Sequence, residues 1–64
     1  MSSEQLSRKE ELTDYAAAMR SRDRKHGIIQ DITILVFTDP LFEDLDDREF
    51  KDLTLEILED AEVL

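Results

Sequence analysis

Few side chains in this 64-residue chain could do chemistry. It has one histidine, His26, and no cysteine, which excludes a disulfide, a thiolate nucleophile and a thiolate metal site. No serine or carboxylate is spaced from His26 as in a catalytic triad. Because Gly27 follows at an expected helix end, we interpret His26 as a solvated or helix-terminal cation. We therefore expect no enzymatic activity and no cofactor.

A cluster of acids follows Pro40 and could collect a divalent cation. Its members are Asp44, Asp46, Asp47 and Glu49. They lack the glycine and the closing bidentate glutamate of a calcium loop. The spacing of Asp46 and Glu49 instead fits the capping box that opens a helix. We interpret these residues as caps and predict no metal site.

The basic run from Arg20 to His26 could hold phosphate. Asp23 interrupts it, no aromatic side chain lies among its bases, and the chain carries a net charge of −9 that repels a polyanion. We therefore predict no direct binding to nucleic acid. The bases would complement a helix C-terminus, or pair with the acidic last helix of the same chain or of a second copy.

The charge is unevenly distributed along the chain. Residues 1–38 contain six acids and six bases, whereas residues 39–64 contain eleven acids and two bases. The whole net charge therefore belongs to the last 26 residues, where it is interleaved with large apolar side chains. Such a surface repels nucleic acid and membranes and suits a basic protein partner.

A carboxylate ridge is the strongest candidate for a binding site. Glu49, Asp52, Glu56 and Glu59 are three or four residues apart, which places one carboxylate about every 5 Å along a helix. The ridge could be a solvated face, an acidic docking face or a mimic of nucleic-acid phosphates, although mimicry would need a second charged row. Leu55 and Phe42 are the expected exposed apolar anchors. The predicted partner-binding residues are Phe42, Glu49, Asp52, Leu55, Glu56, Glu59 and Asp60.

The pattern of apolar residues predicts an all-α fold with three helices. The expected ranges are 3–25, 28–38 and 47–62, with a short helical turn at 40–45. In the first helix Leu12, Tyr15, Ala16 and Met19 share one face; in the last, Phe50, Leu53, Ile57, Leu58, Ala61 and Leu64 do.

The ends of these helices have recognisable signals. Ser7 with Glu10 fits a capping box for the first helix, and Ser2 with Gln5 offers an alternative start. Gly27 is a natural left-handed stop. Asp39 can cap the short turn that Pro40 opens.

The segment 28–38 is ambiguous. Its alternating β-branched residues favour a strand, but its apolar residues also fit a helix. Since neither flanking segment resembles a strand, we predict a central helix. The alternative is that residues 28–37 form a strand paired with a second copy across a two-fold axis.

These observations predict one small helical domain over residues 1–64. Residues 1–26 would form an amphipathic helix with a basic end, and residues 27–64 an apolar and acidic half. A core this small gives a single chain only marginal stability, so we expect a homo-oligomer, most simply a dimer. The polar N-terminus and the short apolar runs predict a cytoplasmic protein.

The leading functional hypothesis is a small acidic regulator, inhibitor or adaptor, of a viral or mobile-element type, that docks its C-terminal half on a larger, basic protein. Two alternatives remain open: a structural subunit of a helical homo-oligomeric assembly, and a nucleic-acid mimic that blocks a basic groove.

Overall fold

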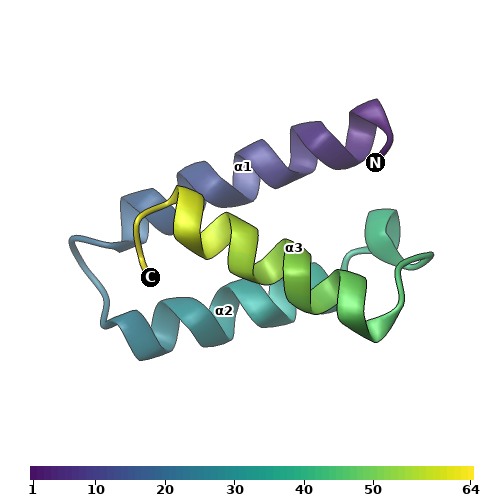
Figure 1. Ribbon diagram of the computed structural model, residues 1–64. Helices are drawn as coiled ribbons and strands as arrows, with labels where there is room; N and C mark the ends of the chain where they lie inside the picture. Colours follow the sequence, from purple (N-terminus) through teal and green to yellow (C-terminus); the bar gives the residue numbers. More distant parts are fainter.

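Three helices and one short 3₁₀ turn make up the chain, and the computed structural model describes all 64 residues. The helices are α1 (Ser3–Met19), α2 (Lys25–Thr38) and α3 (Asp47–Asp60), and η1 (Pro40–Phe42) lies between the last two. Consecutive helices run in opposite directions, and the molecule measures 31 × 20 × 16 Å (Figure 1). The prediction of a compact, all-helical chain with three helices is confirmed.

Helix α1 begins at the earlier of the two predicted start sites. The Ser2 hydroxyl accepts the Gln5 amide N–H at 3.2 Å, and the Gln5 side chain accepts the Ser2 N–H at 3.0 Å. The capping box expected at Ser7 is not used, because α1 already extends through that residue. The Gln5 Nε2 also donates to the Leu41 carbonyl oxygen at 2.8 Å, so the first turn of α1 is tied to η1.

The predicted end of the first helix is wrong. Helix α1 ends at Met19, and a turn over residues 20–24 leads directly into α2. The N–H groups of Arg22 and Asp23 close this turn by donating to the Met19 carbonyl at 2.9 and 2.8 Å. The early reversal lets Met19 and Ile28 reach the same core, which a helix continuing through the polar residues 20–25 would prevent.

Gly27 is consequently not a helix stop. It lies in the first turn of α2, and its φ is not positive. The basic residues beside it do not lie in the last turn of α1 either, because that turn contains none. Arg20 instead reaches the end of α3, where it donates to the Ala61 carbonyl at 3.3 Å and to the Glu62 carboxylate at 2.7 Å.

Pro40 and two aspartates set the boundaries of the last two elements. Asp39 is extended, the conformation that proline favours for the residue before it, and this ends α2. Its carboxylate accepts the Leu41 N–H at 3.0 Å and also binds the Arg8 guanidinium. Asp46 and Glu49 form the predicted capping box of α3, with hydrogen bonds of 2.8 and 3.1 Å.

Helix α3 ends two residues earlier than expected, in a left-handed turn. Glu62 has a φ of 60°, and the Val63 N–H donates to the Leu58 carbonyl at 2.9 Å. This is a Schellman motif with glutamate at the position that usually holds glycine. The reversal buries Val63, and Leu64, which we expected in the core, is half exposed.

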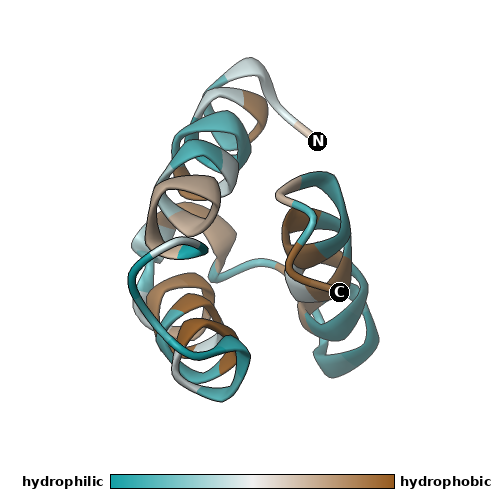
Figure 2. Cartoon of the chain, turned by 90° about the vertical axis from the view of Figure 1, so that its left-hand side faces the viewer, coloured by the Kyte–Doolittle hydropathy of each residue, from teal (hydrophilic) through white to brown (hydrophobic).

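A single apolar cluster occupies the space between the three helices. Its members are Leu12, Ala16, Met19, Ile28, Ile32, Val36, Phe42, Leu53, Ile57, Leu58, Ala61 and Val63. Helices α1 and α2 lie on one side of the molecule and α3 on the other (Figure 2). Residues 28–38 are helical in this chain, as predicted. The alternative, a strand over residues 28–37 that pairs with a second copy across a two-fold axis, stays a prediction.

Phe42 corrects the prediction of an exposed anchor. Its side chain is 0% exposed and lies in the core, because η1 packs against α1 and turns it inward. The exposed phenylalanine is Phe37, which is 68% accessible near the end of α2. Tyr15, expected in the core, is 46% exposed on the outer side of α1.

Candidate partner-binding surfaces

Three surface depressions follow the three helix pairs, and they differ in chemistry. The one between α1 and α3 is polar and is bridged by Lys9, whose Nζ lies 2.8 Å from the Glu56 carboxylate. The one between α2 and α3 is apolar. The one between α1 and α2 is smaller and is lined mainly by Tyr15, Ile34 and Leu35. Apolar surface is therefore left uncovered on both sides of α2.

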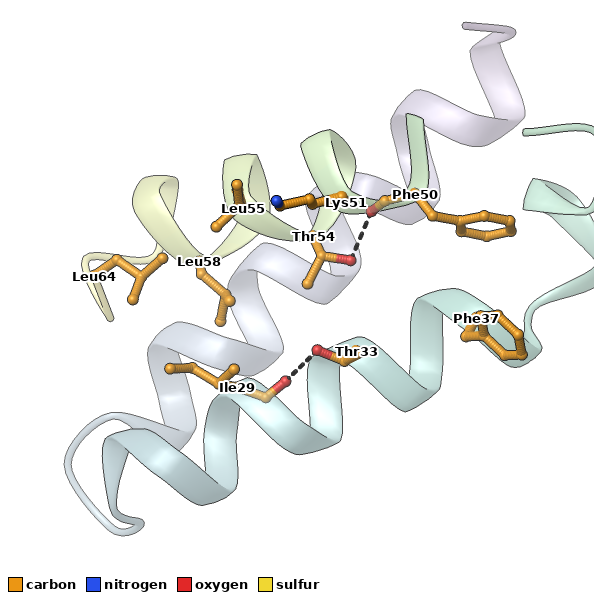
Figure 3. Close-up of a pocket in the computed structure, with 9 residues that line it drawn as sticks. All are labelled: Ile29, Thr33, Phe37, Phe50, Lys51, Thr54, Leu55, Leu58 and Leu64. Carbon is orange, nitrogen blue, oxygen red and sulfur yellow. Dashed lines mark hydrogen bonds between the residues drawn. The ribbon is translucent and has the colours of Figure 1, made fainter. Parts of the chain in front are cut away.

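The α2/α3 groove is the largest uncovered apolar feature of the molecule. It encloses about 340 Å³. Its lining residues are Ile29, Thr33, Phe37, Phe50, Lys51, Thr54, Leu55, Leu58 and Leu64 (Figure 3). Phe37 and Phe50 form one end, with ring centroids 5.7 Å apart. We use the name α2/α3 groove for this set of residues below.

Two threonines in the middle of the groove hide their polar groups. The Thr33 hydroxyl donates to the Ile29 carbonyl at 2.7 Å, and the Thr54 hydroxyl donates to the Phe50 carbonyl at 2.8 Å (Figure 3). Each hydroxyl is thus satisfied by its own helix. The groove therefore offers methyl groups and aromatic rings, and these threonines are small enough to leave room above them.

The two edges of the groove carry different charges. On the α2 side, residues 26–38 include a single formally charged residue, Asp31, in a chain that is 39% charged. On the α3 side, Leu55 is 38% exposed, with Asp52 and Glu59 on the turns before and after it. Lys51 is the one base that lines the groove.

The predicted site residues are only partly brought together. Leu55 lines the groove as an exposed apolar residue, as expected, and Asp52 and Glu59 are exposed beside it. Glu49 is occupied by the capping box and Glu56 by Lys9. Asp60 lies on the opposite side of α3, facing α1. Phe42 is in the core.

Sequence reasoning missed the contribution of α2 to this surface. Ile29 and Phe37 line the groove, and Ile34 and Leu35 are exposed on the other side of the helix. The signal was present, because α2 is apolar nearly all round while one neighbouring layer can cover only one face. Ile32, also on α2, lies in the core of the single chain.

The other candidate features stay separate from the groove. His26 is exposed in the first turn of α2. Of the four bases in residues 20–25, only Arg20 forms an ion pair within the chain. No three of the Asp, Glu and His side chains converge as metal ligands. None of the helices combines the length and apolar character needed to cross a bilayer.

Comparison with protein-family models, curated proteins and solved structures found no match to this chain. The chemistry of its surfaces is therefore the basis for inferring its function.

Proposed function

We propose that this protein is a small non-catalytic binding protein, a regulator, inhibitor or adaptor, that receives an amphipathic helix of a larger protein in the α2/α3 groove. The observation that carries the proposal is the groove itself. It is apolar along its length and its two threonine hydroxyls are satisfied internally, although 39% of the residues of the chain are charged. Apolar grooves between two helices are a recurrent site for a third helix.

The dimensions of the groove suit two or three anchoring side chains. Its α2 wall runs from Ile29 through Thr33 to Phe37, which are four residues apart and span about 12 Å of helix. A bound helix would place apolar residues at positions i, i+3 or i+4, and i+7 along this wall. Phe37 and Leu55 would become buried on binding, and fully desolvated contacts of large side chains contribute most of the binding free energy.

Charge favours a partner helix with basic flanks. Asp52 and Glu59 form no ion pair within the chain and lie on either side of Leu55. They outnumber Lys51, the single base of that edge. Lysine or arginine beside the apolar stripe of a partner would meet these carboxylates, which would raise the association rate more than the affinity. In this proposal residues 27–64, the apolar and acidic half of the chain, still dock on the partner. The anchors are Phe37, Phe50 and Leu55 in place of Phe42.

Two synthetic amphipathic helices provide a direct test. Both would carry the same leucine stripe, one with lysine flanks and one with glutamate flanks, and each would be titrated into isotope-labelled protein. With the lysine peptide we expect changes in amide chemical shift that are confined to α2 and α3. At low salt the glutamate peptide should bind at least about ten-fold more weakly than the lysine peptide. Absence of shifts with the lysine peptide, or shifts spread over α1, would contradict the proposal.

A matched pair of variants separates the groove from the rest of the fold. Thr54→Leu would fill the groove, whereas Thr13→Leu makes the same chemical change on α1, where the threonine also bonds its own helix. We expect Thr54→Leu to abolish peptide binding and Thr13→Leu to retain it. Equal binding by the two variants would exclude the groove as the site.

The acidic edge is best tested at Asp52 and Glu59. Glu56 is a poorer choice because it pairs with Lys9, so its reversal would also disturb the contact between α1 and α3. The double variant Asp52→Lys, Glu59→Lys should weaken the lysine peptide and strengthen the glutamate peptide without loss of helicity. Unchanged preference for the lysine peptide would refute an electrostatic role for this edge.

A nucleic-acid mimic has less support. Mimicry of a duplex requires two rows of negative charge. Even the one row on α3 is interrupted, because the Lys9 ammonium group pairs with Glu56 in the middle of the carboxylate ridge. Strongly salt-dependent competition with DNA for a basic groove would favour mimicry over the binding of a helix.

A further inference from the structure

A second apolar surface lies between α1 and α2, on the side away from α3. Tyr15, Ile34 and Leu35 are 46%, 52% and 38% exposed there, and with Asp31 they enclose a hollow of about 210 Å³. Figure 2 shows why it is uncovered: α3 packs on only one side of the layer formed by α1 and α2. We propose that a second copy of this chain covers this surface in an antiparallel, two-fold symmetric dimer. We call Tyr15, Asp31, Ile34 and Leu35 the α1/α2 face.

The distribution of charge favours a second copy at this face. Helices α1 and α2 belong to residues 1–38, in which acids and bases are equal in number, and the net charge of −9 lies in residues 39–64. Two copies joined through the α1/α2 face keep both α3 helices on the outside of the dimer. Joined through the α2/α3 groove, they would instead bring Asp52 and Glu59 of one copy close to those of the other, and like charges at an interface are costly.

The ends of the molecule are complementary to each other. The turn over residues 20–24 and the segment 43–47 lie at opposite ends (Figure 1). Arg22, Arg24 and Lys25 make no ion pair within the chain, and the other end carries four acids, Glu43, Asp44, Asp46 and Asp47. If the two-fold axis is perpendicular to α2, the two α2 helices are antiparallel. The basic end of each copy then meets the acidic end of the other, and the two end contacts are equivalent, as in any isologous interface.

The dimer would leave both α2/α3 grooves open on its outer sides, and it therefore does not depend on the function proposed above.

The mass of the protein in solution tests the dimer. Sedimentation equilibrium from low micromolar concentrations up to about 0.5 mM should give twice the 7.5 kDa of one chain at the upper end. Ile34→Asp and Tyr15→Glu each change an exposed side chain of the face, and each should give a monomer with unchanged helicity by circular dichroism. Two variants are used so that a loss of folding in one leaves the other decisive.

Leu55→Asp is the matched control. Leu55 has the same exposed fraction as Leu35, 38%, but lies on the α2/α3 groove, so this variant should remain a dimer. A wild-type monomer at every concentration would overturn the proposal. Dissociation by Leu55→Asp with retention of the dimer in Ile34→Asp and Tyr15→Glu would also overturn it, by moving self-association to the groove.

A charge exchange tests the antiparallel orientation. Arg24→Glu should weaken the dimer up to about five-fold at low salt, and adding Glu43→Lys to the same chain should restore it. If the double variant is weaker than the single one, the two ends do not face each other and the antiparallel orientation is wrong.

Discussion

The rings of Phe37 and Phe50 meet across the mouth of the α2/α3 groove, with centroids 5.7 Å apart and an interplanar angle of 42°. This tilted contact joins the C-terminal end of α2 to the N-terminal end of α3. Phe37 contributes to it while remaining 68% exposed. A ring so accessible adds little to the core, and in the function proposed above it is an anchor for the partner helix.

Phe42 and Phe37 should therefore respond differently to truncation. Phe42→Ala removes a fully buried ring from the core and should destabilise the chain by about 3–5 kcal/mol, enough to unfold much of a protein this small. Phe37→Ala should cost about 1 kcal/mol, the scale of one aromatic pair, yet weaken binding of the lysine-flanked helix. Urea unfolding followed by circular dichroism distinguishes them. Equal losses of stability would mean that the burial of Phe42 is incorrect.

Gln5→Glu tests the link between α1 and η1. The substitution preserves the capping box with Ser2 but loses the Nε2 donors to the Leu41 carbonyl and the Asp44 carboxylate, at 2.8 and 3.1 Å. The change should destabilise the fold by about 2 kcal/mol, because acceptors then face one another. Adding Asp44→Asn supplies a donor to the introduced carboxylate and should recover part of the loss. If thermal unfolding shows that Gln5→Glu alone leaves the stability unchanged, this link does not hold η1 in place.

Gly27→Ala should stabilise the protein. Gly27 lies inside α2 without a positive φ, and a Cβ added there would meet no atom within 4 Å. Alanine favours the helix over glycine, chiefly by restricting the unfolded chain, so we expect a gain of about 0.5–1 kcal/mol. If the glycine were a left-handed helix stop, the same substitution would be destabilising. The sign of the change in melting temperature therefore distinguishes the two structures of the α1–α2 connection.

Glu62→Gly should also stabilise the fold, because here the backbone is left-handed and glycine is preferred over a residue with a Cβ. Glu62 holds a left-handed conformation that costs a residue with a Cβ about 1 kcal/mol or more. The substitution removes the exposed ion pair with Arg20, which is worth at most about 1 kcal/mol. We expect a net gain of about a few tenths of a kcal/mol. Arg20→Ala is the control, because it removes the ion pair and the hydrogen bond to the Ala61 carbonyl but leaves the left-handed Glu62 in place. It should not raise the melting temperature.

The sequence by itself determined most of the local structure. The capping box at Asp46 and Glu49, the break at Pro40 and the inward face of α3 at Leu53, Ile57 and Leu58 all follow from contacts between near neighbours. Such features depend on residue type and spacing within a few positions, so they can be predicted from the chain. The exposure of Leu55 follows from the same helical periodicity.

The tertiary structure decided which apolar faces are covered. Phe42 and Phe37 are both phenylalanines near the end of a helix, and only tertiary packing, with η1 against α1, buries the first while the second stays exposed. The end of α1 at Met19 likewise depends on the need for α2 to return to the same core. The apolar character of α2 on nearly all sides indicates that part of its surface stays uncovered, because its two neighbouring helices cannot surround it. Only the packing of α1 and α3 decides that the uncovered part forms the α2/α3 groove.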